Sequence, residues 1–189
     1  MSQTASTTVK SDFSPLRLQH SSLAFRIGAV VAGTMLLTLS SYIEVPMIPV
    51  EMTMQTLAVT MIGALYGWRL GAATIVAWLV EGAIGMPVLA GGMGGLHFFA
   101  GPTAGYLFAF PLAGVLTGWL AERGWNGKHV VLAFAAMLLG NALCLALGAT
   151  WLAVLVGAEK AMMLGVVPFA IGGIVKSALG AAMLKAIAR

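Results

Sequence analysis

The stretch VVLAFAAMLLGNALCLALGATWLAVLV, residues 130–156, decides the class of fold. It lies within residues 129–158, which contain no Asp, Glu, Lys or Arg. A helix needs about 20 mostly apolar residues to cross the hydrocarbon core of a bilayer, and this stretch is long enough. Continuous apolar runs of this kind also exclude the alternating pattern of a membrane β-barrel. We therefore expect a transmembrane helix here.

The composition of the whole chain agrees with that expectation. Of the 189 residues, 60% are hydrophobic and 8% are charged, whereas soluble domains carry about 25% charged residues. This low content of charged residues excludes a soluble enzyme. Nucleic-acid binding is excluded as well, because the ten basic residues are too dispersed to form a phosphate-binding patch despite a net charge of +4. The sequence predicts an all-α integral membrane protein.

Charged residues mark the breaks between the helices. We expect a disordered cytoplasmic tail over residues 1–20, followed by one transmembrane domain over residues 21–189. Gly67 and Gly71 flank Arg69, so the second and third helices are short or continuous with each other. The predicted transmembrane helices are six, at residues 22–42, 54–68, 70–86, 103–121, 130–156 and 166–187.

The basic residues predict the orientation. Six crossings place both termini on one side of the membrane, and Lys and Arg concentrate on the cytoplasmic side. Lys160 is the one basic residue expected in an outer segment, and Lys176 falls within a helix. With the termini inside, the inner segments hold Lys10, Arg17, Arg26, Arg69, Arg123, Lys128, Lys185 and Arg189. Both termini are therefore expected in the cytoplasm.

Two connections between helices have unusual sequences. Residues 42–56, YIEVPMIPVEMTMQT, are mostly apolar although they should face outward. This segment either rests in the lipid interface or forms a lid over a site between the helices. Residues 87–106, PVLAGGMGGLHFFAGPTAGY, hold four glycines in five positions. They form either a hinge or an irregular backbone that lines a cavity, the condition under which such a backbone is tolerated at membrane depth.

Three polar residues fall inside predicted helices: Glu81, Asn141 and Lys176. Ionisable residues within a membrane are costly and are functional candidates. At 1.5 Å per residue, Glu81 and Lys176 lie at similar depths. They form either an ion pair with each other or a site in which Lys176 meets an anionic ligand. Asn141 more often bonds a neighbouring helix than a ligand.

The chain resembles the BioY family, the biotin-binding S components of energy-coupling factor (ECF) vitamin transporters. The resemblance covers about residues 22–187. It rests on four segments in order: VPMIPVEMTMQTLAV (45–59), GWRLGAATIVAWLVEGAIGMPVLAGGMGG (67–95), GPTAGYLFAFPLAG (101–114) and GVVPFAIGGIVKSALGAA (165–182).

The resemblance implies a six-helix bundle that binds biotin near its outer face. The first outer loop and the loop after the third helix would close over the site, and the last three helices would supply side chains. A transmembrane coupling protein and two ATPases would dock on small residues of the first helix, here Ala24, Gly28 and Ala32. The implied substrate-binding residues are Lys176, Asn141, Gly91, Gly92, Gly94, Gly95, Met52, Gln55, Tyr106 and Glu81.

The last motif departs from the family pattern at one position. Pro168, Phe169, Gly172 and Lys176 match the usual Pro-Phe-x-x-Gly-Asp-x-x-Lys, but Gly173 stands where Asp is usual. One polar contact to the ligand is therefore missing or is supplied from elsewhere.

Alternatives to an energised biotin subunit are an S component for another small anionic vitamin or precursor, and a solitary biotin transporter, alone or as a homo-oligomer. An intramembrane enzyme is disfavoured, because the sequence has no GxSxG, HExxH or paired intramembrane carboxylates. We expect neither cofactor nor metal, and a location in the bacterial inner membrane.

Overall fold

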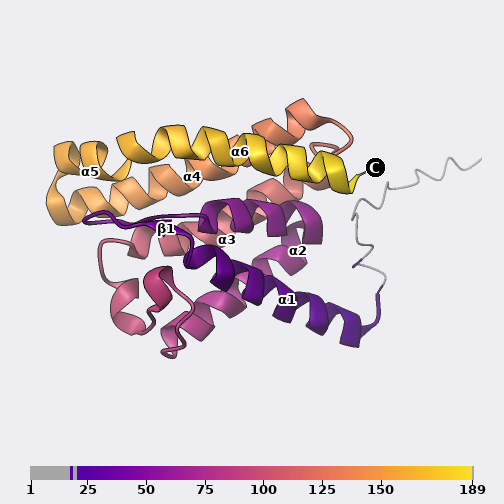
Figure 1. The fold of residues 1–189 in the computed structure, drawn as a ribbon, viewed down its shortest axis with the longest axis horizontal. Helices are drawn as coiled ribbons and strands as arrows, with labels where there is room; N and C mark the ends of the chain where they lie inside the picture. The colour runs from indigo at the N-terminus through magenta and orange to yellow at the C-terminus, as the bar shows by residue number, and fades with distance from the viewer. Residues whose placement is uncertain (1–17, 19–20, 189) are drawn as a thin grey trace, which may run out of the picture.

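The computed structural model describes residue 18 and residues 21–188. The expected tail over residues 1–20 therefore lies outside the described residues, apart from Leu18. Two short strands and two short 3-10 helices, η2 and η3, connect the α-helices (Figure 1). In chain order the elements are α1 (Leu23–Ser41), β1 (Glu44–Val45), β2 (Met52–Thr53), α2 (Gln55–Ala83), η2 (Ala90–Gly92), η3 (Leu96–Phe99), α3 (Ala104–Glu122), α4 (Val130–Val156), α5 (Ala158–Gly165) and α6 (Val167–Ile187).

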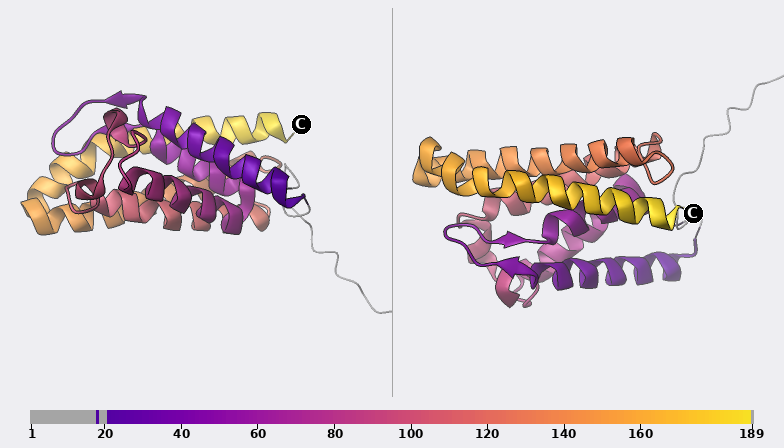
Figure 2. Two further views of the ribbon diagram at one scale, coloured as in Figure 1. Left: turned by 90° about the horizontal axis from the view of Figure 1, so that it is seen from below. Right: turned by 45° about the horizontal axis from the view of Figure 1, so that its top comes forward.

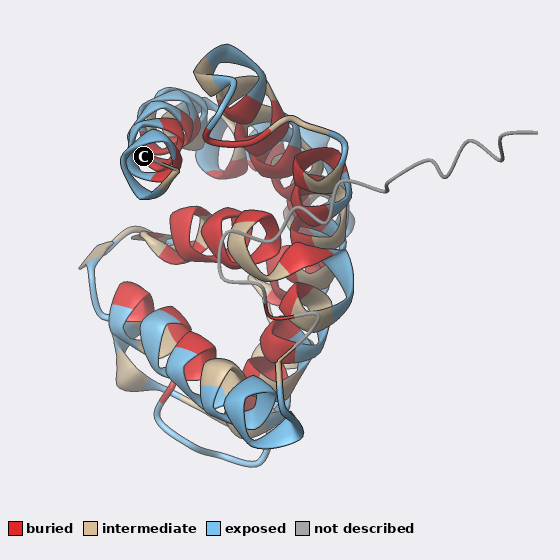
Figure 3. Cartoon of the chain, turned by 90° about the vertical axis from the view of Figure 1, so that its right-hand side faces the viewer, coloured by how far each residue is buried: buried red, intermediate tan, exposed pale blue. Residues whose placement is uncertain are grey.

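The helical segments have the length and composition of membrane spans. Five of them are long and apolar enough to cross a bilayer, with α5 and α6 counted together as Ala158–Ile187. Buried residues gather where the helices face one another, and exposed residues cover the outer faces (Figure 3). Large exposed side chains on these outer faces are apolar, for example Phe25 and Met35 of α1 and Ile171 of α6. The chain is a multi-pass membrane protein.

Helix α2 is broken at Gly67. This residue has φ 78° and ψ 169°, a backbone conformation that favours glycine. The parts before and after it fold back on each other. Their close approach is shown at Gly71, where an added Cβ would lie only 3.1 Å from the Cα of Gly63. The sequence left the helices at 54–68 and 70–86, on either side of Arg69, as short or continuous with each other. The structure has them as one element with its bend at Gly67, and we call its two parts the first arm (residues 55–66) and the second arm (residues 68–83).

The bend packs tightly against α3. A Cβ added at Gly118 would lie 2.6 Å from the backbone nitrogen of Trp68 and 2.8 Å from the carbonyl oxygen of Gly63. The Trp68 N–H, which the bend frees from the helix, donates to Oε1 of Glu122 at 3.2 Å. Close contact between small residues is a usual way of packing helices in membranes.

The two ends of the bundle hold different segments (Figures 1 and 2). The beginning of α1, the α3–α4 connection and the C-terminal end of α6 lie at one end. The β1–β2 hairpin, η2, η3 and α5 lie at the other. The short helix α5, which was not expected, follows Gly157, whose φ of 88° ends α4. This arrangement brings the hairpin, the α2–α3 connection and the short helix α5 together at one end of the bundle.

Candidate binding site

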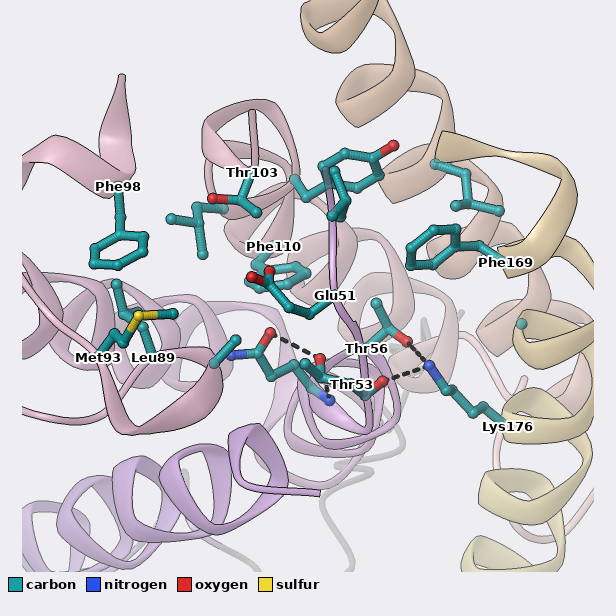
Figure 4. A pocket seen from close by; sticks show the side chains of 17 residues that line it. Glu51, Thr53, Thr56, Leu89, Met93, Phe98, Thr103, Phe110, Phe169 and Lys176 are labelled. Atoms are coloured by element: carbon teal, nitrogen blue, oxygen red, sulfur yellow. Dashed lines mark hydrogen bonds between the residues drawn. The ribbon is translucent and has the colours of Figure 1, made fainter. Parts of the chain in front are cut away.

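A cavity lies at the end of the bundle that holds the hairpin, η2 and η3 (Figure 4). It encloses about 720 Å³, its open mouth included. The lining residues come from the hairpin, α2, the α2–α3 connection, α3, α4 and α6: Val50, Glu51, Thr53, Gln55, Thr56, Leu89, Ala90, Met93, Phe98, Thr103, Tyr106, Leu107, Phe110, Leu145, Phe169, Gly173 and Lys176.

The hairpin forms one wall of the cavity. Its strands pair antiparallel, with Glu44 opposite Thr53 and Val45 opposite Met52. Val50 is buried against the cavity, whereas Ile48, between the strands, is 90% exposed. Residues 42–56 therefore cover the cavity on one side and present an apolar side chain outward on the other. The packing of this segment over the cavity agrees with the expected lid, and its contact with the lipid interface stays a prediction.

The α2–α3 connection forms the facing wall and is anchored by backbone carbonyls. The indole Nε1 of Trp78 donates to the Val88 oxygen at 3.1 Å, and the Ser41 hydroxyl donates to the same oxygen at 2.9 Å. The Tyr42 hydroxyl donates to the Pro87 oxygen at 2.7 Å. These bonds tie the connection to the end of α1 and to the second arm of α2, and they carry Leu89 into the cavity wall.

The four expected glycines of this connection lie outside the cavity lining. Gly91, Gly92 and Gly95 have positive φ angles of 64°, 69° and 121°, so they direct the chain. A Cβ added at Gly92 would lie 2.8 Å from the Tyr42 ring, and a Cβ at Gly94 would collide with the Met86 carbonyl. The glycines thus shape the wall, while the side chains between and after them, such as Met93 and Phe98, line it.

Tyr106 both lines the cavity and holds its frame together. Its hydroxyl donates to the Gly165 oxygen at 2.9 Å, and its ring stacks on Phe169 with centroids 6.2 Å apart. It therefore connects α3 to α5 and α6. Gly148 of α4 packs directly against the same ring.

Lys176 enters the cavity wall from α6. It is 8% exposed, and its ammonium donates to the backbone oxygen of Thr53 and to Oγ1 of Thr56, the latter at 3.4 Å. These acceptors are neutral, and within residues 18 and 21–188 no carboxylate pairs with Lys176. The cavity therefore contains a buried positive charge without a counter-charge, a feature that favours an anionic ligand.

Glu81 does not pair with Lys176, which corrects the expected resting partnership. Similar depth in the membrane does not bring two side chains together. Lys176 and its neighbour Gly180 belong to α6, which packs against the first arm of α2: a Cβ at Gly180 would lie 3.0 Å from Leu57. Glu81 belongs to the second arm and is outside the cavity lining.

Two other expected residues lie behind the cavity wall. The Asn141 amide donates to the Met137 oxygen at 3.0 Å and to the Ser177 hydroxyl at 3.1 Å, so it joins α4 to α6. Met52 packs on α6, where its sulfur would lie 3.3 Å from a Cβ at Gly172. Gly173 does line the cavity, but it brings no polar group there.

Gln55 lines the cavity as expected, and Glu51 lines it although the sequence interpretation omitted it. Gln55 is 5% exposed, and its Nε2 atom has no hydrogen-bond partner within the described chain. An acidic residue in a mostly apolar segment expected to face outward was the signal available in the sequence.

The three small residues expected to dock a partner lie on an outer face of α1. Ala24, Gly28 and Ala32 are exposed. A Cβ added at Gly28 would meet no atom within 4 Å. This face is therefore not used for packing within the described part of the chain.

The arrangement defines a class: a multi-pass membrane protein with a mainly apolar cavity, one buried cation and a few polar groups at one end of its helices. In the described residues no group of three or more His, Cys, Asp or Glu could hold a metal ion. The chain belongs to the BioY family, whose profile it matches over residues 10–189. The resemblance found in the sequence is thereby confirmed.

Curated relatives and a solved structure agree with this family. The chain is 36% identical over 155 residues to the probable biotin transporter BioY of Pyrococcus horikoshii, covering 82% of this chain and 91% of the relative. It is 39% identical over 153 residues to the biotin transporter BioY of Rhizobium etli, covering 77% and 81%. The crystal structure of an S component for biotin from an ECF-type ABC transporter superposes with a TM-score of 0.77 over 88% of this chain and 94% of that one, at 23% identity. At that identity the match establishes the fold.

Proposed function

We propose that this chain is the biotin-binding membrane subunit of a biotin uptake system. Family membership and the biotin transporters among its relatives support the ligand. The observation that carries the proposal is the cavity itself. It combines aromatic walls with the buried ammonium of Lys176, which forms no ion pair within the described chain. Biotin is the cargo, and the proposal assigns the chain no catalytic step and no cofactor.

The cavity suits a ligand with an apolar body and an anionic tail. Phe98, Phe110 and Phe169 line it and offer apolar surface for a fused ring. Lys176 is the only basic lining residue in the described chain, and we assign it the carboxylate of biotin. A hydrogen bond between charged groups of this kind is worth about 1.5–3 kcal/mol.

We propose that the chain crosses the membrane six times, with the two arms of α2 counted separately and both termini in the cytoplasm. The folding back at Gly67 supports two crossings within α2. The first residues of α1 and the last of α6 lie at the same end of the bundle (Figures 1 and 2), as an even number of crossings requires. The cavity would then lie at the outer side.

Isothermal titration calorimetry of the purified chain with biotin tests the ligand. We expect saturable binding at micromolar biotin or below. Absence of heat and of tryptophan fluorescence change with a monodisperse protein would overturn the assignment to biotin. Saturable binding of another anionic vitamin, with none of biotin, would instead favour an S component for a different ligand.

The partner in this proposal is an ECF coupling protein with its ATPases, docked on the exposed face of α1. Gly28→Trp should leave biotin binding unchanged and prevent co-purification with the coupling module, because a bulky side chain blocks close backbone approach. Val154→Trp, at an exposed position of α4, is the matched control. Co-purification of Gly28→Trp at the wild-type yield would contradict this docking face.

A further inference from the structure

We propose that Glu51 and Gln55 form a second polar pole of the cavity, which binds the urea group of the ligand while Lys176 binds its carboxylate. In this arrangement Glu51 accepts from one urea N–H group and Gln55 donates to the urea oxygen beside it. The inference rests on the proposed function, because it takes biotin as the ligand. It adds the orientation of the ligand and a residue that determines specificity.

Glu51 places a carboxylate inside the cavity. It is the only acidic residue among those lining it, and it is partly buried. Figure 4 shows its carboxylate pointing into the cavity, away from the ammonium of Lys176. No hydrogen bond or ion pair of Glu51 occurs within the described residues. Its oxygens are therefore available to N–H donors that enter the cavity.

Gln55, which also lines the cavity, supplies an unused donor. The side chain is more than nine-tenths buried, and the Thr53 hydroxyl fixes the amide by donating to its Oε1 at 2.8 Å. The Nε2 atom at the other end of the amide has no partner within the described chain. A buried donor without an acceptor costs free energy, and a ligand acceptor in the cavity would remove that cost. If the amide is flipped, an unused acceptor stands there instead, which a urea N–H would satisfy.

The two charges of the cavity have separate surroundings. The ammonium of Lys176 is held by Thr53 and Thr56 and does not reach Glu51. An anionic group would be repelled by Glu51 and attracted by Lys176, which fixes where the ligand carboxylate lies. A neutral group rich in N–H donors fits the Glu51 side. The cavity is therefore built for a ligand that is anionic at one end and a neutral donor at the other.

A urea has the right pattern of donors and acceptor. In the five-membered ring of biotin each urea N–H points to the same side as the carbonyl oxygen, so one N–H can donate to a carboxylate oxygen in a charge-assisted hydrogen bond. The urea carbonyl oxygen accepts from an amide N–H. Biotin carries such a urea in its fused ring and a carboxylate at the end of its tail.

Calorimetry with three ligands tests the assignment: biotin, its methyl ester, which has no tail charge, and biotin methylated on a urea nitrogen. We expect Glu51→Ala to weaken binding of both biotin and the ester at least about tenfold, with an intermediate loss for Glu51→Gln. N-methylbiotin should bind the wild type more weakly and lose less on Glu51→Ala. Lys176→Met should weaken biotin more than the ester.

Glu159→Ala is the control, because it removes an exposed carboxylate of α5 outside the cavity lining. It should leave all three affinities unchanged, and size-exclusion profiles and melting temperatures check that each variant folds. If Glu51→Ala binds biotin within about twofold of the wild type, or more tightly, Glu51 is no ligand contact and the inference is wrong. Failure of the wild type to bind biotin would instead overturn the proposed function.

Discussion

At the end of the bundle that holds the Gly67 bend, polar groups have partners: Trp68 N–H reaches Glu122, and the buried Asn126 amide reaches the Ala121 oxygen at 3.0 Å. At the cavity end, Gln55 Nε2 and Glu44 Oε2 have none. These are the only buried side-chain N or O atoms without a hydrogen-bond partner in the described chain. An unpaired buried polar atom costs free energy. The presence of such atoms at the cavity end distinguishes this end, which binds a ligand, from the end with the Gly67 bend, which only packs.

The largest effect should come from filling the packed end. Gly118→Val would place side-chain carbons against the backbone of Trp68 and Gly63, which cannot move aside as a flexible side chain would. We expect a loss of about 3 kcal/mol in the free energy of unfolding, measured by denaturation in mixed micelles. Gly28→Val, at a position with open space, is the control. Equal stability of the two variants would mean that the close approach at Gly118 does not hold the fold together.

The next effect should appear in binding and leave packing intact. Lys176→Met keeps most of the side-chain volume but removes the charge, so biotin affinity should fall by about 1.5–3 kcal/mol, measured by calorimetry. Glu81→Gln removes a charge outside the cavity and should change affinity little. Wild-type affinity in a well-folded Lys176→Met protein would remove Lys176 from the site.

A smaller effect is expected where the two regions meet. Tyr106→Phe keeps the ring on Phe169 but removes the hydroxyl that donates to Gly165, so unfolding should become easier by about 1 kcal/mol. Biotin affinity should fall less than in Lys176→Met. Thermal unfolding with and without biotin measures both. A loss of binding as large as that of Lys176→Met would instead place the hydroxyl in ligand contact.

The smallest effect should come from Glu122→Gln. The amide oxygen can still accept from Trp68 N–H, so only the charge contribution is lost, and the free energy of unfolding should change by about 0.5 kcal/mol. Glu122→Ala, which removes the acceptor, should cost more. Equal stability of both variants with the wild type would show that the freed N–H at the bend needs no protein partner.

The positions of the helices were predictable, because the hydropathy of a membrane span depends only on residues that are neighbours in the sequence. The helix at 130–156 was placed at its observed bounds, and those at 22–42, 103–121 and 166–187 within one residue at each end. The BioY resemblance and the polar lining by Lys176, Gln55 and Tyr106 also came from sequence. The short helix α5 was missed because Glu159 and Lys160 marked this segment as a connection between spans, and hydropathy alone does not distinguish a short helix from a loop.

The sequence by itself therefore determined the membrane class, the helix positions and the family. Tertiary structure alone decided that α2 turns at Gly67, that Lys176 meets Thr53 and Thr56 rather than Glu81, and that Glu51 faces the cavity. The reason is geometric. Apolar content and length are sums over neighbouring residues, whereas side-chain partners depend on how each helix is rotated about its axis and where a loop returns. Those are set by contacts between segments far apart in the chain, such as Gly180 on Leu57 and Tyr42 on Gly92.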